Sequence, residues 1–456
     1  MGRGLIQSLL AIIAGAALFA WPALLNGYPI LFSDTGAILE MGLLPSMGWD
    51  KPFVYGPLAA ALSLRRSLWL VAAAQVLALS YALWAAQSAF AIPSARRHVT
   101  LCLILAAGTS APWFASTLLP DALTGIAVLG LLTVLGQLPR RHTLLLGILT
   151  TIAIASHLSH LILAAGMIAA IALCRFRVPW RAIATISAAL LYLLASNVVG
   201  HGRFAVSPYG SVFALARLIA DGPARDYLQR VCPDPAIALC AWRDKLTDDS
   251  DQFLWDPASP FWSDPLPLPE FAAQAGRLVA GTILSEPWRV LRLAYRNAAH
   301  ELIHIDLGDT LGPDYLAETV RPRIARWYPG AELSRFDASR QIAGTLLPIA
   351  AKLLPLQRAL ILFGLVGSAA LLISSLRRPN QRADVAAVIL LALAANAIAT
   401  GSLSAIHDRY EARLVWLIVI PILFRFRPET APFRIAATMP QMDRTSAKRL
   451  SPEGQR

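Results

Sequence analysis

Residues 182–200 read AIATISAALLYLLASNVVG, a stretch without a charged side chain. A helix of this length rises about 1.5 Å per residue and nearly spans the roughly 30 Å hydrocarbon core of a bilayer. Similar apolar stretches recur along the 456-residue chain, which is 56% hydrophobic and 15% charged. Because unpaired backbone groups are costly in lipid, these stretches should be helices. The sequence therefore predicts an all-α polytopic membrane protein.

Hydropathy predicts about ten transmembrane helices and a division of the chain into four parts. The predicted spans are residues 5–26, 67–91, 99–117, 121–137, 143–156, 159–174, 182–200, 355–376, 384–402 and 412–425. The four parts are an N-terminal transmembrane module (1–200), a mostly helical extracytoplasmic domain (201–354), a C-terminal transmembrane module (355–425) and a tail (426–456). The composition of the tail favours disorder.

The net charge of +12 is distributed by predicted topology. Four short loops are basic: Arg96–Arg97, Arg140–Arg141, Arg175/Arg177/Arg181 and Arg377/Arg378/Arg382. Residues 201–343 instead hold 18 of the 28 acidic residues, against 15 Lys and Arg. The positive-inside rule then puts the arginine loops and both termini in the cytoplasm and the long segment outside. We expect membrane lipids as surroundings and no nucleic-acid partner.

Ionisable residues at the predicted outer ends of the spans form the strongest candidate site. Asp34 and Lys51 lie in a polar window after the first span, Asp121 opens another span, and Arg409 precedes the last. Ionisable groups at the edge of hydrocarbon are costly, so function is the default hypothesis for them. Arg and Lys together suit a phosphate, and a carboxylate beside them suits a base in a transfer reaction. The alternative is a set of interfacial anchors and helix caps.

Four short motifs occur here in the order typical of one family. They are Phe32-Ser33-Asp34-Thr35-Gly36, the segment from Trp49-Asp50-Lys51-Pro52 to Leu58, Leu119-Pro120-Asp121-Ala122-Leu123, and Asp408-Arg409-Tyr410. In this order the chain resembles the glycosyltransferase C superfamily, above all its aminoarabinose transferase and protein mannosyltransferase branches. The resemblance implies an inverting glycosyltransferase of the bacterial inner membrane. Its donor would be a polyprenyl-phosphate-linked sugar, and its acceptor an extracytoplasmic lipid, glycan or protein.

The resemblance also implies roles for individual residues. Asp34 would be the general base, Asp121 a second acid, and Lys51 and Arg409 the phosphate ligands, with Tyr55 and Tyr410 as further substrate-binding residues. Family members often have two adjacent acids in the first loop, whereas Thr35 follows Asp34 here. This departure puts metal dependence in doubt, so we expect no required cofactor while a divalent metal stays possible.

Histidines and cysteines supply further candidates. His157 and His160 interrupt an apolar stretch three residues apart, a spacing that puts both on one helix face. They either line the donor pocket or make ordinary interhelical hydrogen bonds. Cys232 and Cys240 lie close together in the predicted outside segment, where a disulfide is chemically permitted.

Residues 269–305 predict a helix broken at Pro287, with Leu291, Tyr295, Ala298, Leu302 and Ile305 on one face. The opposite face carries His300-Glu301-x-x-His304, which matches the zinc metallopeptidase signature. No convincing third ligand follows it, and arginines share that face, so a solvated helix face explains the match better. Asp249-Ser250-Asp251 similarly has the Asp-x-Asp pattern of nucleotide-sugar enzymes, but an acidic external loop accounts for it.

Two further functions compete with glycosyl transfer. A zinc metallopeptidase would use His300, Glu301 and His304. A transporter or flippase of lipid-linked intermediates would also need cations on one membrane face. A transporter should have charges near mid-span and mirrored halves, and neither is evident in the sequence. The sequence therefore favours the enzyme.

Overall fold

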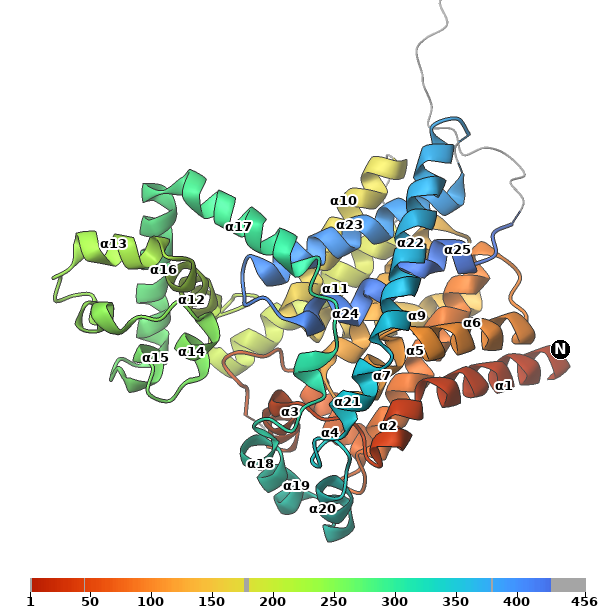
Figure 1. Ribbon diagram of the computed structural model, residues 1–456, viewed down its shortest axis with the longest axis horizontal. Coiled ribbons are helices and arrows are strands. Elements are labelled where there is room, and N and C mark those ends of the chain that lie inside the picture. The colour runs from red at the N-terminus through yellow and green to blue at the C-terminus, as the bar shows by residue number, and fades with distance from the viewer. Residues whose placement is uncertain (1, 45, 176–179, 379, 428–456) are drawn as a thin grey trace, which may run out of the picture.

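The computed structural model describes residues 2–44, 46–175, 180–378 and 380–427. Over these residues the regular structure is helical, and Ile30 and Thr117 form an isolated β-bridge. Figure 1 shows a body of packed helices with a lobe projecting from one side. The all-helical prediction is therefore confirmed. The predicted inner-loop residue Arg177 and the predicted disordered tail from residue 428 onward lie outside the described residues.

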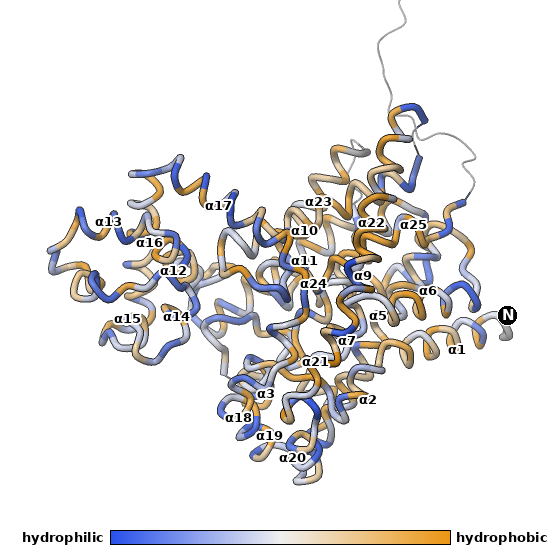
Figure 2. Tube along the Cα trace, in the orientation of Figure 1, coloured by the Kyte–Doolittle hydropathy of each residue, from blue (hydrophilic) through white to orange (hydrophobic). Residues whose placement is uncertain are grey.

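Four helices of the described chain are long and apolar enough to cross a membrane. They are α5 (Trp69–Phe90), α11 (Trp180–His201), α22 (Leu354–Ser375) and α23 (Gln381–Gly401). Shorter apolar helices occupy Gly4–Phe19, Pro120–Leu135 and Leu158–Leu173. Figure 2 shows the apolar residues concentrated in the body, whereas the lobe is more polar. The structure thus agrees with a membrane protein, and the count of ten spans remains a prediction.

Prolines divide several of the predicted spans. The first becomes α1 (Gly2–Phe19) and α2 (Trp21–Asn26), with Pro22 in the first turn of α2. The third becomes α6 (Ala95–Gly108) and α7 (Ala111–Ser116), with Pro112 likewise placed. The last is divided into α24 (Asp408–Val415), a short 3-10 helix and α25 (Ile420–Leu423), which holds Pro421. Proline lacks the backbone N–H and clashes with the preceding turn, which hydropathy does not register.

Five further helices also belong to the body. They are α3 (Ser33–Leu43), α4 (Tyr55–Ser63), α8 (Thr124–Leu132), α9 (Arg140–Ala155) and α10 (Leu158–Arg175). At one end, the Gln137 N–H donates to the Ala89 carbonyl (2.7 Å) and the Gln381 side chain donates to the Leu135 carbonyl (2.7 Å). The opposite ends of α8 and α23, near Asp121 and Thr400 respectively, line a cavity described below.

The lobe has a hydrophobic core of its own. It consists of α12 (Gly210–Asp221), α13 (Pro223–Val231), α14 (Ser250–Trp255), α15 (Pro260–Ser263), α16 (Leu268–Ser285) and α17 (Pro287–Glu301). Leu215, Ile219 and Phe271 belong to its buried centre, and Trp49 of the first loop packs against it. A disulfide joins Cys232 to Cys240, as the sequence predicted. The predicted helix break at Pro287 is also confirmed.

The rest of the predicted extracytoplasmic domain belongs to the body. It forms α18 (Leu316–Thr319), α19 (Arg321–Trp327), α20 (Gly330–Asp337) and α21 (Leu346–Ala351). Val320 and Phe336 are part of the main core. The buried Glu332 carboxylate accepts hydrogen bonds from the Tyr28 hydroxyl (2.9 Å) and the Leu68 N–H (3.0 Å). Residues 201–354 therefore do not pack as one unit, because the lobe and the 316–351 segment have separate cores.

Candidate functional site

A cavity of about 1540 Å³ lies where the ends of the body helices meet the lobe. Seven predicted site residues line it: Asp34, Lys51, Tyr55, Asp121, His157, Arg409 and Tyr410. They come from separate loops and helix ends between residues 34 and 410, so the fold brings them together. Such a shared, partly apolar cavity is the usual setting of a ligand site.

The first loop contributes a carboxylate and an ammonium. Asp34 lies in the first turn of α3, where the helix dipole favours an anion. Lys51 Nζ is 3.4 Å from Asp34 Oδ1 and also contacts the Asp50 carboxylate. Burial alone would lower the pKa of Lys51, but the two carboxylates raise it above its ordinary value. Lys51 is therefore charged, and Asp34 is paired with it rather than free.

Close packing of α3 against α4 holds this loop in place. A Cβ on Gly42 would lie 2.1 Å from the Gly56 carbonyl oxygen, so neither helix tolerates a larger side chain there. Tyr55, at the start of α4, donates its hydroxyl proton to the Gln75 side chain. Gln75 in turn donates to the Thr117 carbonyl (2.9 Å). Tyr55 thus lines the cavity mainly with its ring.

Arg409 contacts no acid with its guanidinium in the part of the chain that the structure describes. Its guanidinium lies over the rings of Phe32 (4.3 Å) and Tyr410 (4.9 Å), and Nη2 donates to the Tyr410 hydroxyl (3.2 Å). Among the described residues, no carboxylate oxygen is within 4.0 Å of the guanidinium. Its Nε is buried without a hydrogen-bond partner. Arg409 therefore offers donors to an anion entering the cavity.

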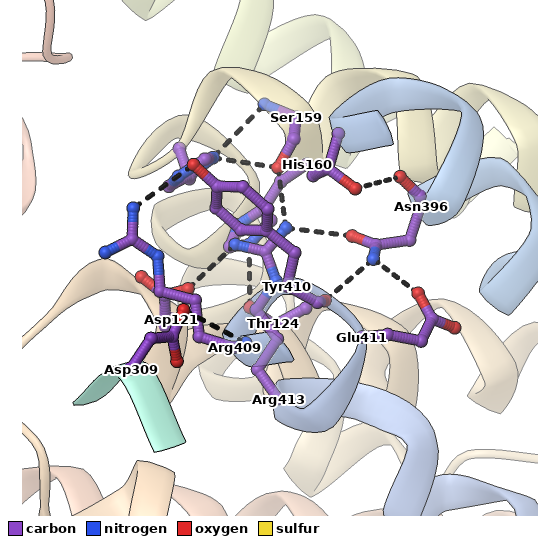
Figure 3. Close-up of polar contacts among 12 residues, drawn as sticks. Asp121, Thr124, Ser159, His160, Asp309, Asn396, Arg409, Tyr410, Glu411 and Arg413 are labelled. Carbon is purple, nitrogen blue, oxygen red and sulfur yellow. Dashed lines mark hydrogen bonds and ion pairs between the residues drawn. The ribbon is translucent and has the colours of Figure 1, made fainter. Parts of the chain in front are cut away.

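Asp121 is held by an arginine that sequence reasoning missed. Arg413 is only 1% exposed, and its Nη1 donates to Asp121 Oδ1 (2.9 Å). Its Nη2 donates to Ser159 Oγ (2.8 Å) and Asn396 Oδ1 (2.8 Å), and Asn396 donates to Glu411 (Figure 3). Arg413 follows Arg409 by four residues, a spacing that puts both on one helix face and was the available signal. The paired Asp121 is better suited to positioning than to proton transfer.

The two histidines of the 156–160 segment have different surroundings. His157 lines the cavity, and its Nδ1 is 2.8 Å from Ser159 Oγ. His160 is fully buried; its Nε2 is 2.8 Å from Thr124 Oγ1 and its Nδ1 is 2.7 Å from the Ala153 carbonyl oxygen. Both ring nitrogens of His160 contact neighbouring helices, which fits the alternative of ordinary interhelical hydrogen bonds. Of these two histidines, His157 is the one that lines the cavity.

The lobe closes the cavity with residues that the sequence reading had set aside. Asp249 caps α14, accepting from the Asp251 N–H (2.8 Å), and Asp251 Oδ2 is 2.9 Å from His407 Nε2. On its other side His407 Nδ1 is 3.7 Å from Asp309 Oδ2. Burial would raise the pKa of Asp251, but the hydrogen bond from His407 and its charge lower it overall. The explanation of Asp251 as an external-loop acid was therefore incomplete, because distant loops meet here.

Aromatic rings form the wall between Lys51 and the lobe. Trp49 is stacked on Phe213, with ring centroids 5.3 Å apart, and lies 5.8 Å from Trp255. Lys51 Nζ is 5.5 Å from the centroid of Trp255. Trp49 and Trp255 both line the cavity. Their flat apolar faces beside charged and hydroxyl groups suit an amphipathic substrate with a ring.

The zinc signature does not form one helical face. Helix α17 ends at Glu301, so His304 lies in the following loop, where its Nδ1 is 2.8 Å from the His300 carbonyl oxygen. Glu301 points inward instead, and its Oε2 accepts from the His407 N–H (3.1 Å). Over the described residues, no group of three or more His, Cys, Asp or Glu side chains is placed to hold a metal ion. The geometry therefore gives the peptidase alternative no support.

The raised pKa of Glu301 predicts that the protein loses stability as the pH rises from 4.5 to about 8. Burial raises its pKa from 4.5 to about 8, against opposing effects of the His407 N–H and Arg413, while Asp309 and Asp408 add to the rise. A group whose pKa rises on folding stabilises the fold below its unfolded pKa, and that stabilisation is lost as the pH rises through the folded pKa. Thermal unfolding at pH 5 to 9 should therefore give a midpoint that falls with pH, and less so in Glu301→Gln. An unchanged slope in Glu301→Gln would contradict this, and the exposed Glu270→Gln is the control.

Comparisons with known proteins add no family. No protein-family model, no curated protein and no solved structure matches this chain. The inference about function therefore depends on the residues and their geometry.

Chemically, the cavity combines an unneutralised cation with several carboxylates. Arg409 is the centre of positive charge, and Lys51 becomes a second anion ligand if it leaves Asp34. Asp34 would then be free to accept a proton. Groups suited to bind an anion and to accept a proton therefore line one cavity at the ends of apolar helices.

Proposed function

We propose that the protein is a membrane glycosyltransferase that moves a sugar from a polyprenyl-phosphate carrier to an extracytoplasmic acceptor. The observation that carries the proposal is the Arg409 guanidinium, which lines a cavity of about 1540 Å³ and has no contacting carboxylate among the residues that the structure describes. Arg409 is half-buried, and a cation that is partly removed from water without a contacting counter-ion is costly unless a ligand supplies the charge. A phosphate is the natural complement of a planar guanidinium.

The position of the cavity supports a lipid-linked substrate. It lies at the ends of α10 and α23, and apolar residues of both, including Ile162 and Ala399, line it beside the charged groups. The opposite helix ends meet near Gln137 and Gln381, next to the predicted arginine loops. With those loops in the cytoplasm, the cavity opens at the outer face. We therefore favour a glycosyltransferase C type of architecture in a bacterial inner membrane, with both termini inside.

The proposed reaction is a single displacement. The carrier phosphate binds Arg409 and draws Lys51 away from Asp34. Asp34 takes the proton of the acceptor hydroxyl, whose oxygen forms a bond to the anomeric carbon. The bond from that carbon to the phosphate oxygen breaks, and its electron pair leaves with the polyprenyl phosphate, stabilised by both cations. Attack opposite the leaving group inverts the anomeric carbon.

The test measures release of the carrier. Purified protein in lipid vesicles is supplied with undecaprenyl phosphate carrying single sugars and with cell-envelope acceptors, and free undecaprenyl phosphate is quantified by mass spectrometry. Asp34→Asn should lower the rate by about 10²–10⁴-fold, the range of a lost general base. The control is the exposed Asp337→Asn. Full activity in Asp34→Asn would refute the base assignment, and carrier crossing the vesicle without sugar release would point to a flippase.

A further inference from the structure

Helix α17 connects the lobe to the end of α23 and has one well-packed face. Its buried residues include Asn297 and Ala298, which lie toward α23. Ser402, just after α23, donates its hydroxyl proton to the Ala294 carbonyl (2.8 Å). A Cβ on Gly401 would lie 2.7 Å from the Asn297 carbonyl oxygen, so the two helices touch closely. This face fixes how the rest of α17 is oriented.

A second face of α17 is apolar and exposed. Trp288 and Tyr295 are each 77% exposed, and Leu291 between them is 59% exposed. Their spacing of three and four residues puts them on one stripe. Leu284 (83%) precedes the stripe and Ile303 (72%) follows it. Leu291 and Tyr295 also belong to the apolar face expected from the sequence, but that face is divided: Ala298 is buried and Ile305 packs against the main core, whereas Leu291 and Tyr295 are exposed. A contiguous apolar surface of this kind marks an interaction site.

Basic residues border the stripe. Arg292 and Arg296 are exposed and lie on the side of α17 next to the stripe. Over the described residues, neither arginine forms an ion pair. Arg289 is instead paired with Asp226 (2.6 Å) and Glu286 (2.8 Å). An aromatic and aliphatic stripe beside arginines is typical of a helix lying in a bilayer interface, with its rings at headgroup level.

Helix α17, which carries the stripe, packs against a membrane-length helix. Near this contact, α23 has an exposed apolar side chain, Ile398. Figure 1 shows α17 running from the lobe toward this end of α23. The stripe therefore lies on a helix that is packed against the end of a membrane-length helix.

We propose that α17 is an interfacial anchor. Trp288, Leu291 and Tyr295 insert at the boundary of the acyl chains in the leaflet that faces the cavity, and Arg292 and Arg296 contact lipid phosphates. The partner is the bilayer surface itself. The anchor holds the lobe, and with it Asp251, over the cavity. This proposal depends on the membrane location of α23 and not on the transfer chemistry.

The test places a fluorophore on the stripe. Tyr295→Cys, in a chain with Cys102 and Cys174 replaced by alanine, is labelled with an environment-sensitive dye and reconstituted in vesicles containing anionic lipid. Emission should shift to shorter wavelength, and lipids brominated near the headgroup end of the acyl chain should quench it. Asp244→Cys, in the exposed part of the lobe, is the control and should show neither effect.

Two results would overturn the proposal. In one, the label at residue 295 behaves like the label at residue 244, which means that the stripe is in water. In the other, its emission shifts but brominated lipid does not quench it, which means that protein covers the stripe. Leu291→Cys, on the same stripe, provides an independent reading if Tyr295→Cys fails to fold.

Discussion

Replacing Arg409 with glutamine is expected to lower the rate of sugar transfer by about 10²–10³-fold, the usual cost of removing one preorganised donor to developing charge. Glutamine keeps hydrogen-bonding atoms near Phe32 and Tyr410 but removes the only guanidinium of the described chain that lines the cavity without a contacting acid. Stabilisation of the leaving phosphate would then depend on Lys51 alone, whose charge Asp34 and Asp50 partly neutralise. The measurement is the initial rate at which undecaprenyl phosphate is released, at saturating and at limiting concentrations of the sugar donor.

Two matched variants separate charge from geometry. Arg409→Lys keeps the charge but loses the planar fork, so it should retain more activity than glutamine and less than the parent. Arg321→Gln removes an arginine from the surface, where it pairs with Asp337, and should change nothing. If Arg409→Gln transfers sugar at the parental rate, phosphate binding by Arg409 is excluded and the proposed function loses its main support.

The helices and the clustering of candidate site residues in one cavity were both expected from the sequence, because both follow from the length of the apolar stretches and from the residues at their ends. Apolar length identifies helices, and acids or bases at successive helix ends must lie at one of two faces. Asp34, Lys51, Asp121 and Arg409 follow that rule and line one cavity. The same reasoning missed the pairing of Asp34 with Lys51, because the conformation of the 44–54 loop decides it.

Long-range pairing could not be predicted from one sequence. His407 lies between Asp251 and Asp309 only because the lobe folds back over the start of α24. Asn396 reads as an isolated polar residue in an apolar helix, and only the structure shows that it bonds Arg413 and Glu411. The apolar face expected on α17 is divided between a buried part with Ala298 and an exposed part with Leu291 and Tyr295, because periodicity cannot say what such a face will contact.

The buried pair of Asp121 and Arg413 should produce the largest effect on stability. Arg413→Met leaves the Asp121 carboxylate buried without its contacting counter-ion, and losing one partner of a buried pair costs about 3–5 kcal/mol. Combining it with Asp121→Leu removes the stranded charge, so the double variant should recover a large part of the loss. Thermal unfolding in detergent, compared across the four members of this cycle, measures the coupling.

The cycle also distinguishes ion pairing from packing. If lost packing around Arg413 were the whole cause, the double variant would be no more stable than Arg413→Met. If the pair were unimportant, Arg413→Met would unfold at the parental temperature, as expected of the exposed control Arg321→Met, whose pair with Asp337 is screened by water. Recovery in the double variant would show that Arg413 is present to keep Asp121 ionised and fixed at the cavity wall. Asp121 and Arg413 form a buried pair 2.9 Å apart, whereas Asp34 is 37% exposed and lies 3.4 Å from Lys51, so the proton acceptor is better sought at Asp34.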